Sequence, residues 1–157
     1  MATVFPFDGI EIPLRLVGPN TAPSVLLLSG GPGRVNYLPD GSPSGSVRTI
    51  AADPRGVGAS GGGPHDLGRA FADLEEIRSH LGIDRWAIVG HSWGVDLAMA
   101  DAVEYPSAAN GVVAACGTGV QNDRDWSAAY HAARHVEPEL QINTNTGRPQ
   151  RTAGKLA

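Results

Sequence analysis

A single serine lies between two glycines in the stretch "AIVGHSWGVDLAMA", residues 87–100. The pattern is Gly90-x-Ser92-x-Gly94, with an apolar run of strand length before it and residues typical of a helix after it. Small residues two before and two after such a serine let the strand and the helix pack closely around a sharp turn. The hydroxyl then stands exposed, and the new helix directs its amides towards a developing oxyanion. The sequence therefore predicts that Ser92 is a nucleophile at a strand-to-helix elbow.

Two other glycine motifs offer competing interpretations. Residues 58–62 also fit G-x-S-x-G, but no helix pattern directly follows Ser60. Gly56, Gly58 and Gly61 fit the G-x-G-x-x-G fingerprint of dinucleotide-binding proteins. However, the next helix is expected several residues later, and the next strand ends without the carboxylate that would bind a ribose. No Gly-Lys-Ser/Thr occurs, which excludes a P-loop, so the elbow at Ser92 is the favoured interpretation.

The elements that must position Ser92 alternate along the chain. Residues 3–17 read as two extended segments joined at the turn signal Asp8-Gly9. Buried apolar strands are expected at 24–29, 47–53 and 85–90, a fourth apolar strand at 111–116, and helices at 67–81, 93–105 and 122–136. Asp66 is the expected N-cap of the first helix, and Gly82 follows its end. A β-hairpin followed by strands that alternate with helices predicts an α/β protein with a mostly parallel sheet flanked by helices.

Bulk properties narrow the class of partner. The chain has 157 residues and a net charge of −4, so it lacks the basic surface that a nucleic-acid partner requires. The N-terminus shows no signal-peptide pattern, and no apolar run approaches the roughly 20 residues of a membrane helix. The only cysteine, Cys116, cannot close an intrachain disulfide. We expect a single-domain protein of the cytoplasm without nucleic-acid or membrane partners.

Three motifs occur in the order seen in α/β-hydrolases: "LLLSGGPG", "DPRGVGAS" and "VGHSWG". From about residue 4 to 140 the chain resembles the proline iminopeptidase-like branch of that superfamily. The resemblance implies an α/β-hydrolase fold with Ser92 as nucleophile and an oxyanion hole formed by the amides of Gly31 and Trp93. It also implies that Asp53, Arg55 and Gly56 brace the loop beside the pocket. Two positions depart from the family pattern: Ser29 replaces the usual histidine, and Val95 replaces a second glycine found in many peptidases.

The resemblance also divides the chain. Residues 1–120 correspond to the N-terminal part of the hydrolase core and 121–142 to the start of a helical cap, while 143–157 form a divergent polar tail that we expect to be disordered. In the family the acid and the histidine of the triad follow the serine, beyond the cap. We therefore expect a fold that is incomplete at its C-terminus and a chain without those two residues.

None of the five histidines is a strong substitute for the missing base. His91 adjoins Ser92 on the elbow, where adjacent side chains diverge, and His80 is expected at the surface near a helix end. His65 precedes the first helix, near the carboxyl edge of the sheet. His131 and His135 have the spacing of a metal-binding pair, but no third ligand is evident. No metal or other cofactor is therefore expected.

The predicted reaction is acyl transfer from a small ester, amide or short peptide through Ser92. We expect feeble turnover, because the histidine that would act as the base is missing. The alternative is a non-catalytic pseudoenzyme or small-molecule binder on the same scaffold. Without further strands beside it, the apolar strand at 111–116 is expected to be an exposed edge through which copies of the chain self-associate.

Overall fold

The computed structural model describes residues 2–4, 6, 8–41 and 45–117, together with the backbone of two short strands at 140–142 and 149–151. The chain forms two compact units, residues 1–118 and 119–157. The second contains an antiparallel pair, β7 (Leu140–Ile142) and β8 (Pro149–Arg151), which the sequence analysis did not predict. The predicted helix at 122–136 lies outside the described residues, and the proposed division at 120 and 142 stays a prediction.

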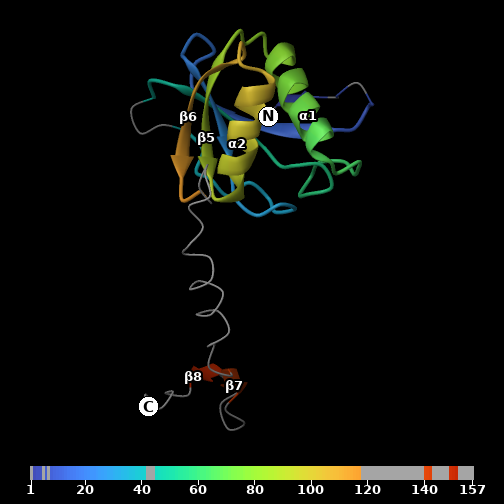
Figure 1. The fold of residues 1–157 in the computed structure, drawn as a ribbon, viewed down its shortest axis with the longest axis vertical. Helices are drawn as coiled ribbons and strands as arrows, with labels where there is room; N and C mark the ends of the chain where they lie inside the picture. Colours follow the sequence, from blue (N-terminus) through green and yellow to red (C-terminus); the bar gives the residue numbers. More distant parts are fainter. Residues whose placement is uncertain are drawn as a thin grey trace. The chain divides into compact units, whose positions relative to one another are not determined.

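The first unit is built on a six-stranded sheet (Figure 1). Its strands lie in the order β1-β2-β4-β3-β5-β6. They are β1 (Ala2–Val4), β2 (Ile12–Val17), β3 (Ser24–Leu28), β4 (Arg48–Ala52), β5 (Trp86–His91) and β6 (Ala109–Ala115). The β1–β2 and β2–β4 pairs are antiparallel, and β3, β4, β5 and β6 run parallel. The prediction of a mostly parallel sheet with an N-terminal antiparallel pair is confirmed.

The two helices of this unit begin and end close to their predicted limits. Helix α1 (Leu67–His80) is capped by Asp66, whose Oδ1 accepts the Arg69 amide at 2.8 Å. Gly82, at φ 65°, follows its C-terminal end. Helix α2 (Trp93–Glu104) starts one residue after Ser92. None of the described helices is both long and apolar enough to span a bilayer.

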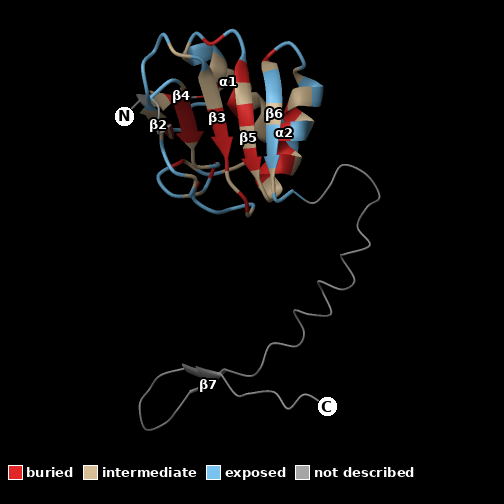
Figure 2. Ribbon diagram, turned by 90° about the vertical axis from the view of Figure 1, so that its left-hand side faces the viewer, coloured by how far each residue is buried: buried red, intermediate tan, exposed pale blue. Residues whose placement is uncertain are grey.

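Both helices cover the same face of the sheet (Figures 1 and 2). Leu74 and Ile77 of α1 and Leu97 of α2 join one apolar core with strand residues such as Leu26 and Ile88. Burial alternates along β5, where Trp86, Ile88 and Gly90 are buried and the residues between them are half-buried. The alternation follows from the position of the helices, which in the described part of the chain cover only one face of the sheet.

Candidate active site

Ser92 occupies the sharp turn between β5 and α2. Its φ of 53° and ψ of −123° place a non-glycine residue in the left-handed half of backbone space. The turn is tied to its surroundings, because the Ser92 amide donates to the Ala115 carbonyl at 2.9 Å and the Ser92 carbonyl accepts from Val95 at 2.9 Å. Such strain persists only where the surrounding structure enforces it, and it is frequent at functional sites.

The two glycines of the motif are required by close backbone contacts. A Cβ on Gly90 would lie 2.5 Å from the Gly94 carbonyl oxygen and 2.7 Å from the Val95 Cα. A Cβ on Gly94 would overlap the Leu28 carbonyl and lie 2.7 Å from the Ser29 carbonyl oxygen. Helix α2 therefore starts directly against the ends of β3 and β5, which only glycine allows at these two positions.

The loop after β3 lies against the elbow. A Cβ on Gly30 would be 2.6 Å from the Ser92 Cβ, so the loop backbone approaches the serine closely. The Gly30 amide donates to the Tyr37 hydroxyl at 2.9 Å, and that hydroxyl lies 2.6 Å from Nδ1 of His91. Gly31, the next residue, has a φ of 79°. The Gly30 amide is therefore already bonded within the protein.

The Tyr37–His91 contact was not predicted from the sequence. The two residues are 54 positions apart, and no spacing signal links them. Since the Tyr37 oxygen accepts the Gly30 amide, its own proton is free to bond Nδ1 of His91. The ring of His91 is thereby turned towards the β3 loop.

Asp53, at the end of β4, joins three segments of the chain. Its Oδ1 accepts the Asn36 amide at 2.7 Å and lies 3.8 Å from a guanidinium nitrogen of Arg15. Its carbonyl accepts the Ser60 hydroxyl at 2.8 Å. Ser60, the serine of the second G-x-S-x-G pattern, is thus buried in a loop as a structural residue.

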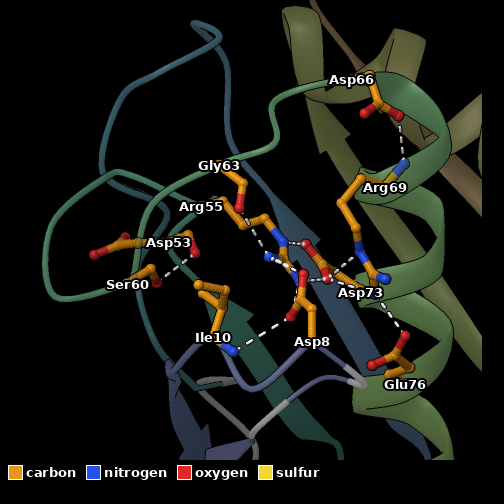
Figure 3. Close-up of polar contacts among 10 residues, drawn as sticks. All are labelled: Asp8, Ile10, Asp53, Arg55, Ser60, Gly63, Asp66, Arg69, Asp73 and Glu76. Carbon is orange, nitrogen blue, oxygen red and sulfur yellow. Dashed lines mark hydrogen bonds and ion pairs between the residues drawn. The ribbon is translucent and has the colours of Figure 1, made fainter.

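Arg55 is the centre of a buried ion-pair network (Figure 3). Its guanidinium donates to both oxygens of Asp73 on α1, at 2.5 and 2.6 Å, and to both oxygens of Asp8, at 2.6 and 3.0 Å. It also donates to the Gly63 carbonyl at 3.3 Å. The hydrogen bond that Arg55 donates to Asp73, and then the one to Asp8, raises the pKa of Arg55 despite its burial. In turn, the hydrogen bond from Arg55 lowers the pKa of Asp8.

This network connects the N-terminal turn, the loop after β4 and helix α1 (Figure 3). Arg69 extends it along α1 by pairing with Asp73 at 2.8 Å and with Glu76 at 2.5 Å. Gly56, next to Arg55, has a φ of 69°, and a Cβ there would lie 2.6 Å from Cε1 of His65. The sequence could not have identified the acidic partners, because they lie 47 and 18 residues from Arg55 with no motif between them.

The described histidines lie at three separate places. His91 bonds Tyr37, His80 is exposed at the last turn of α1, and His65 is exposed at the rim of a cavity. None of these three makes a recorded hydrogen bond with Ser92, and His131 and His135 lie outside the described residues. Within the described part of the chain, no cluster of His, Cys, Asp and Glu could hold a metal ion.

A cavity of about 430 Å³ extends between α1 and the sheet. Trp93, the residue directly after the elbow serine, lines one side of it, and Leu26, Leu74 and Ile77 line its interior. The sequence analysis did not predict it, because a strand or helix pattern indicates which residues face inward but not how far apart the facing surfaces lie.

Comparison with known proteins extends these observations. A family model described as the alpha/beta hydrolase fold matches residues 23–147. A proline iminopeptidase of Xanthomonas citri is 41% identical over 99 residues, which cover 54% of this chain and 29% of that protein. One from Xylella fastidiosa is 33% identical over 134 residues, covering 73% of this chain and 39% of that protein.

A similar solved structure is the crystal structure of proline iminopeptidase from Mycobacterium smegmatis. It superposes with a TM-score of 0.67 at 23% identity, over 88% of this chain and 50% of that one, a likeness that concerns the fold alone. The chain spans about a third of the length of the two curated relatives. With a matching family model, a matching sheet and partial sequence homology, this chain belongs to the α/β-hydrolase fold family and is related to the proline iminopeptidases.

Proposed function

We propose that this chain is a serine hydrolase of the proline iminopeptidase-like type, which cleaves small esters, amides or peptides through Ser92. The observation that carries the proposal is the strained backbone of Ser92 at the junction of β5 and α2. The homology to proline iminopeptidases supports hydrolase chemistry.

In the proposed reaction, Oγ of Ser92 attacks the carbonyl carbon and the carbonyl oxygen becomes negatively charged. The proposed oxyanion donors are the amide of Trp93, at the positive end of α2, and the amide of Gly31. The leaving group departs with the proton of the serine, and water then releases the acid. Gly90, Gly94, Asp53, Arg55 and Gly56 have structural roles in this proposal, because their contacts hold the elbow and the adjoining loops.

We expect the turnover of this chain to be feeble. An activated serine needs a base within hydrogen-bond reach, and the described histidines make no recorded bond to Ser92. In a triad enzyme that has lost a member, the oxyanion hole and substrate binding still supply about 10³- to 10⁴-fold catalysis over water. A non-catalytic binder on the same scaffold is the second candidate. It is favoured by the finding that none of the described histidines bonds Ser92.

A fluorophosphonate probe tests the proposal, because it reacts with activated serines. Because Ser92 has no bonded base among the described histidines, we expect slow labelling at Ser92, located by peptide mass spectrometry, that disappears in Ser92→Ala. Ser60→Ala is the matched control, since it removes the other serine in a G-x-S-x-G pattern and should leave labelling unchanged. Absence of labelling in folded protein would instead support the non-catalytic candidate.

A further inference from the structure

The loop after β3 is rich in glycine, with Gly30, Gly31 and Gly33 close together. Glycine loses more conformational freedom on folding than any other residue, so a loop of this composition does not hold one geometry by itself. The proposed reaction nevertheless needs a fixed geometry here, because a displacement of about 1 Å at a reacting group can cost a factor of about 100 in rate. Bonds to other parts of the chain must therefore hold these residues in place.

The hydroxyl of Tyr37 provides such a bond. It accepts the Gly30 amide at 2.9 Å and lies 2.6 Å from Nδ1 of His91, the last residue before the elbow serine. The bond from the Arg34 amide to the Gly31 carbonyl, at 3.1 Å, lies within the loop, so it shapes the turn without anchoring it. The Tyr37 hydroxyl thus connects the glycine-rich part of the loop to the end of β5.

Tyr37 is itself held in place by its neighbour Asn36, which is 7% exposed. The Asn36 side-chain amide donates to the Leu27 carbonyl of β3 at 2.7 Å, and its backbone amide donates to Oδ1 of Asp53 at 2.7 Å. The Tyr37 ring then meets the His91 ring edge to face, with centroids 5.7 Å apart. The backbone of Tyr37 is therefore anchored to the sheet, although 49% of the residue is exposed.

Gly30 is enclosed between this hydroxyl and the elbow. A Cβ on Gly30 would lie 2.7 Å from the Tyr37 hydroxyl, 2.6 Å from the Ser92 Cβ and 3.1 Å from the His91 carbonyl oxygen. The peptide that follows Gly30 carries the amide of Gly31, the proposed oxyanion donor. Because the two glycines share this peptide, holding Gly30 restricts where the Gly31 amide can lie.

We propose that Tyr37 is a positioning residue whose hydroxyl, oriented by His91, holds the loop against the elbow and so places the amide of Gly31. Its role in catalysis rests on the proposed function of Ser92. The hydroxyl donates its proton to Nδ1 of His91 and accepts the Gly30 amide, so the three groups form one chain of hydrogen bonds. Tyr37 and His91 act through the backbone of the loop and not on the substrate.

Hydrogen exchange of the Gly30 amide, followed by NMR on the full chain, tests the link without any reaction. Tyr37→Phe removes the hydroxyl and keeps the ring, and we expect the Gly30 amide to exchange about tenfold faster or more. Tyr105→Phe is the matched control, because Tyr105 caps the far end of α2 and its hydroxyl should not affect Gly30. Unchanged exchange in Tyr37→Phe would overturn the link.

The rate at which a fluorophosphonate labels Ser92 tests the role in catalysis. The Oγ–phosphorus bond forms as the phosphorus–fluorine bond breaks, fluoride leaves, and the serine proton passes to water. We expect Tyr37→Phe to lower the maximal labelling rate about tenfold and to leave the half-saturating probe concentration unchanged, because a misplaced oxyanion donor weakens the transition state and not ground-state binding. Tyr105→Phe should be labelled at the parent rate.

Variants of His91 test whether the two side chains act as a unit. His91→Phe removes the acceptor, and we expect labelling about three- to tenfold slower than in the parent. The double variant with Tyr37→Phe should be no slower than Tyr37→Phe alone. His91→Asn keeps an acceptor near the position of Nδ1 and should restore most of the rate lost in His91→Phe. A double variant whose loss equals the product of the two single losses would overturn the coupling.

The outcomes separate this proposal from the proposed function. No labelling of the folded parent would contradict the proposed function and, with it, the role of Tyr37 in catalysis, while the exchange of the Gly30 amide would still decide the link. Equal labelling of the parent and Tyr37→Phe, with faster exchange of the Gly30 amide in the variant, would support the link and overturn its role in catalysis.

Discussion

At the scale of single residues, the elbow depends on a serine in a conformation that suits glycine. The φ of 53° at Ser92 costs about 1–3 kcal/mol for a residue with a Cβ. Replacing Ser92 by glycine relieves this strain but increases the entropy of the unfolded chain. Because strain is the larger of the two effects, the half-buried Ser92 is a position where the side chain lowers the stability of the fold.

We therefore predict that Ser92→Gly is more stable than Ser92→Ala by about 1 kcal/mol, as measured by urea denaturation. Both variants lack the hydroxyl, so their comparison isolates the effect of the Cβ. A more stable alanine variant would show that the turn is not strained.

Gly94 offers a second prediction at this scale. In an ordinary helix, glycine-to-alanine substitution stabilises by about 1 kcal/mol. Here the new Cβ would overlap the Leu28 carbonyl, so we predict that Gly94→Ala lowers the free energy of unfolding by about 2–3 kcal/mol. Gly111→Ala is the control, because a Cβ on Gly111 meets nothing within 4 Å. Similar effects of the two substitutions would contradict the close contact between α2 and β3.

At the scale of elements, the packing of α2 buries a carboxylate. Asp101 is 1% exposed, and its Oδ1 has no hydrogen-bond partner among the described residues. Desolvation raises the pKa of Asp101 from 3.8 to about 6; the negative charge of Glu75 on α1 adds to the rise, and Arg78 partly offsets it. The folded state thus favours the protonated form of Asp101. The free energy of unfolding therefore falls as the pH rises from about 4 to about 6, and the loss is complete above that range.

We predict that Asp101→Asn raises the free energy of unfolding by about 2 kcal/mol at pH 7.5. At pH 4, where Asp101 is largely protonated in the folded protein, the difference should nearly vanish. Urea denaturation at both pH values measures it. Glu104→Gln, an exposed position on the same helix, is the control and should change stability by only about 0.5 kcal/mol or less at either pH. A pH-independent effect at Asp101 would contradict the burial of a titrating carboxylate.

At the scale of the whole molecule, β6 lies at the edge of the six-stranded sheet formed by the described residues. It pairs with β5 on one side, and Val113 in its middle is 57% exposed. An exposed apolar edge strand is a template for pairing with another chain. The self-association expected from the sequence at 111–116 therefore stays a prediction, now with a residue on which to test it.

We predict that the parent protein forms dimers at increasing concentration and that Val113→Lys shifts them towards monomer. Size-exclusion chromatography with light scattering gives the mass. Val103→Lys, at a 78% exposed position on α2, is the control for added charge and should leave the association unchanged. A parent protein that stays monomeric at every concentration would contradict edge pairing.

The sequence by itself determined the features that depend on local patterns. Apolar runs of strand length, helical spacing, the Asp66 cap and the glycines around Ser92 all act between residues close in the chain. The structure confirms the four predicted apolar strands, the helices predicted at 67–81 and 93–105, and the mostly parallel sheet. These features can be predicted from the sequence, because backbone sterics and the burial of one face depend on residues only a few positions apart.

Only the tertiary structure decided which distant side chains meet. Two contacts join residues from separate elements: the pairing of Arg55 with Asp8 and Asp73, and the bond of Tyr37 to His91. The burial of the Asp101 carboxylate likewise depends on how separate elements pack. The cavity beneath α1 is of the same kind, because it depends on the separation of two packed surfaces. Hydrogen bonds, ion pairs and packing act through space over a few ångströms, and a linear pattern does not record which distant segments come that close.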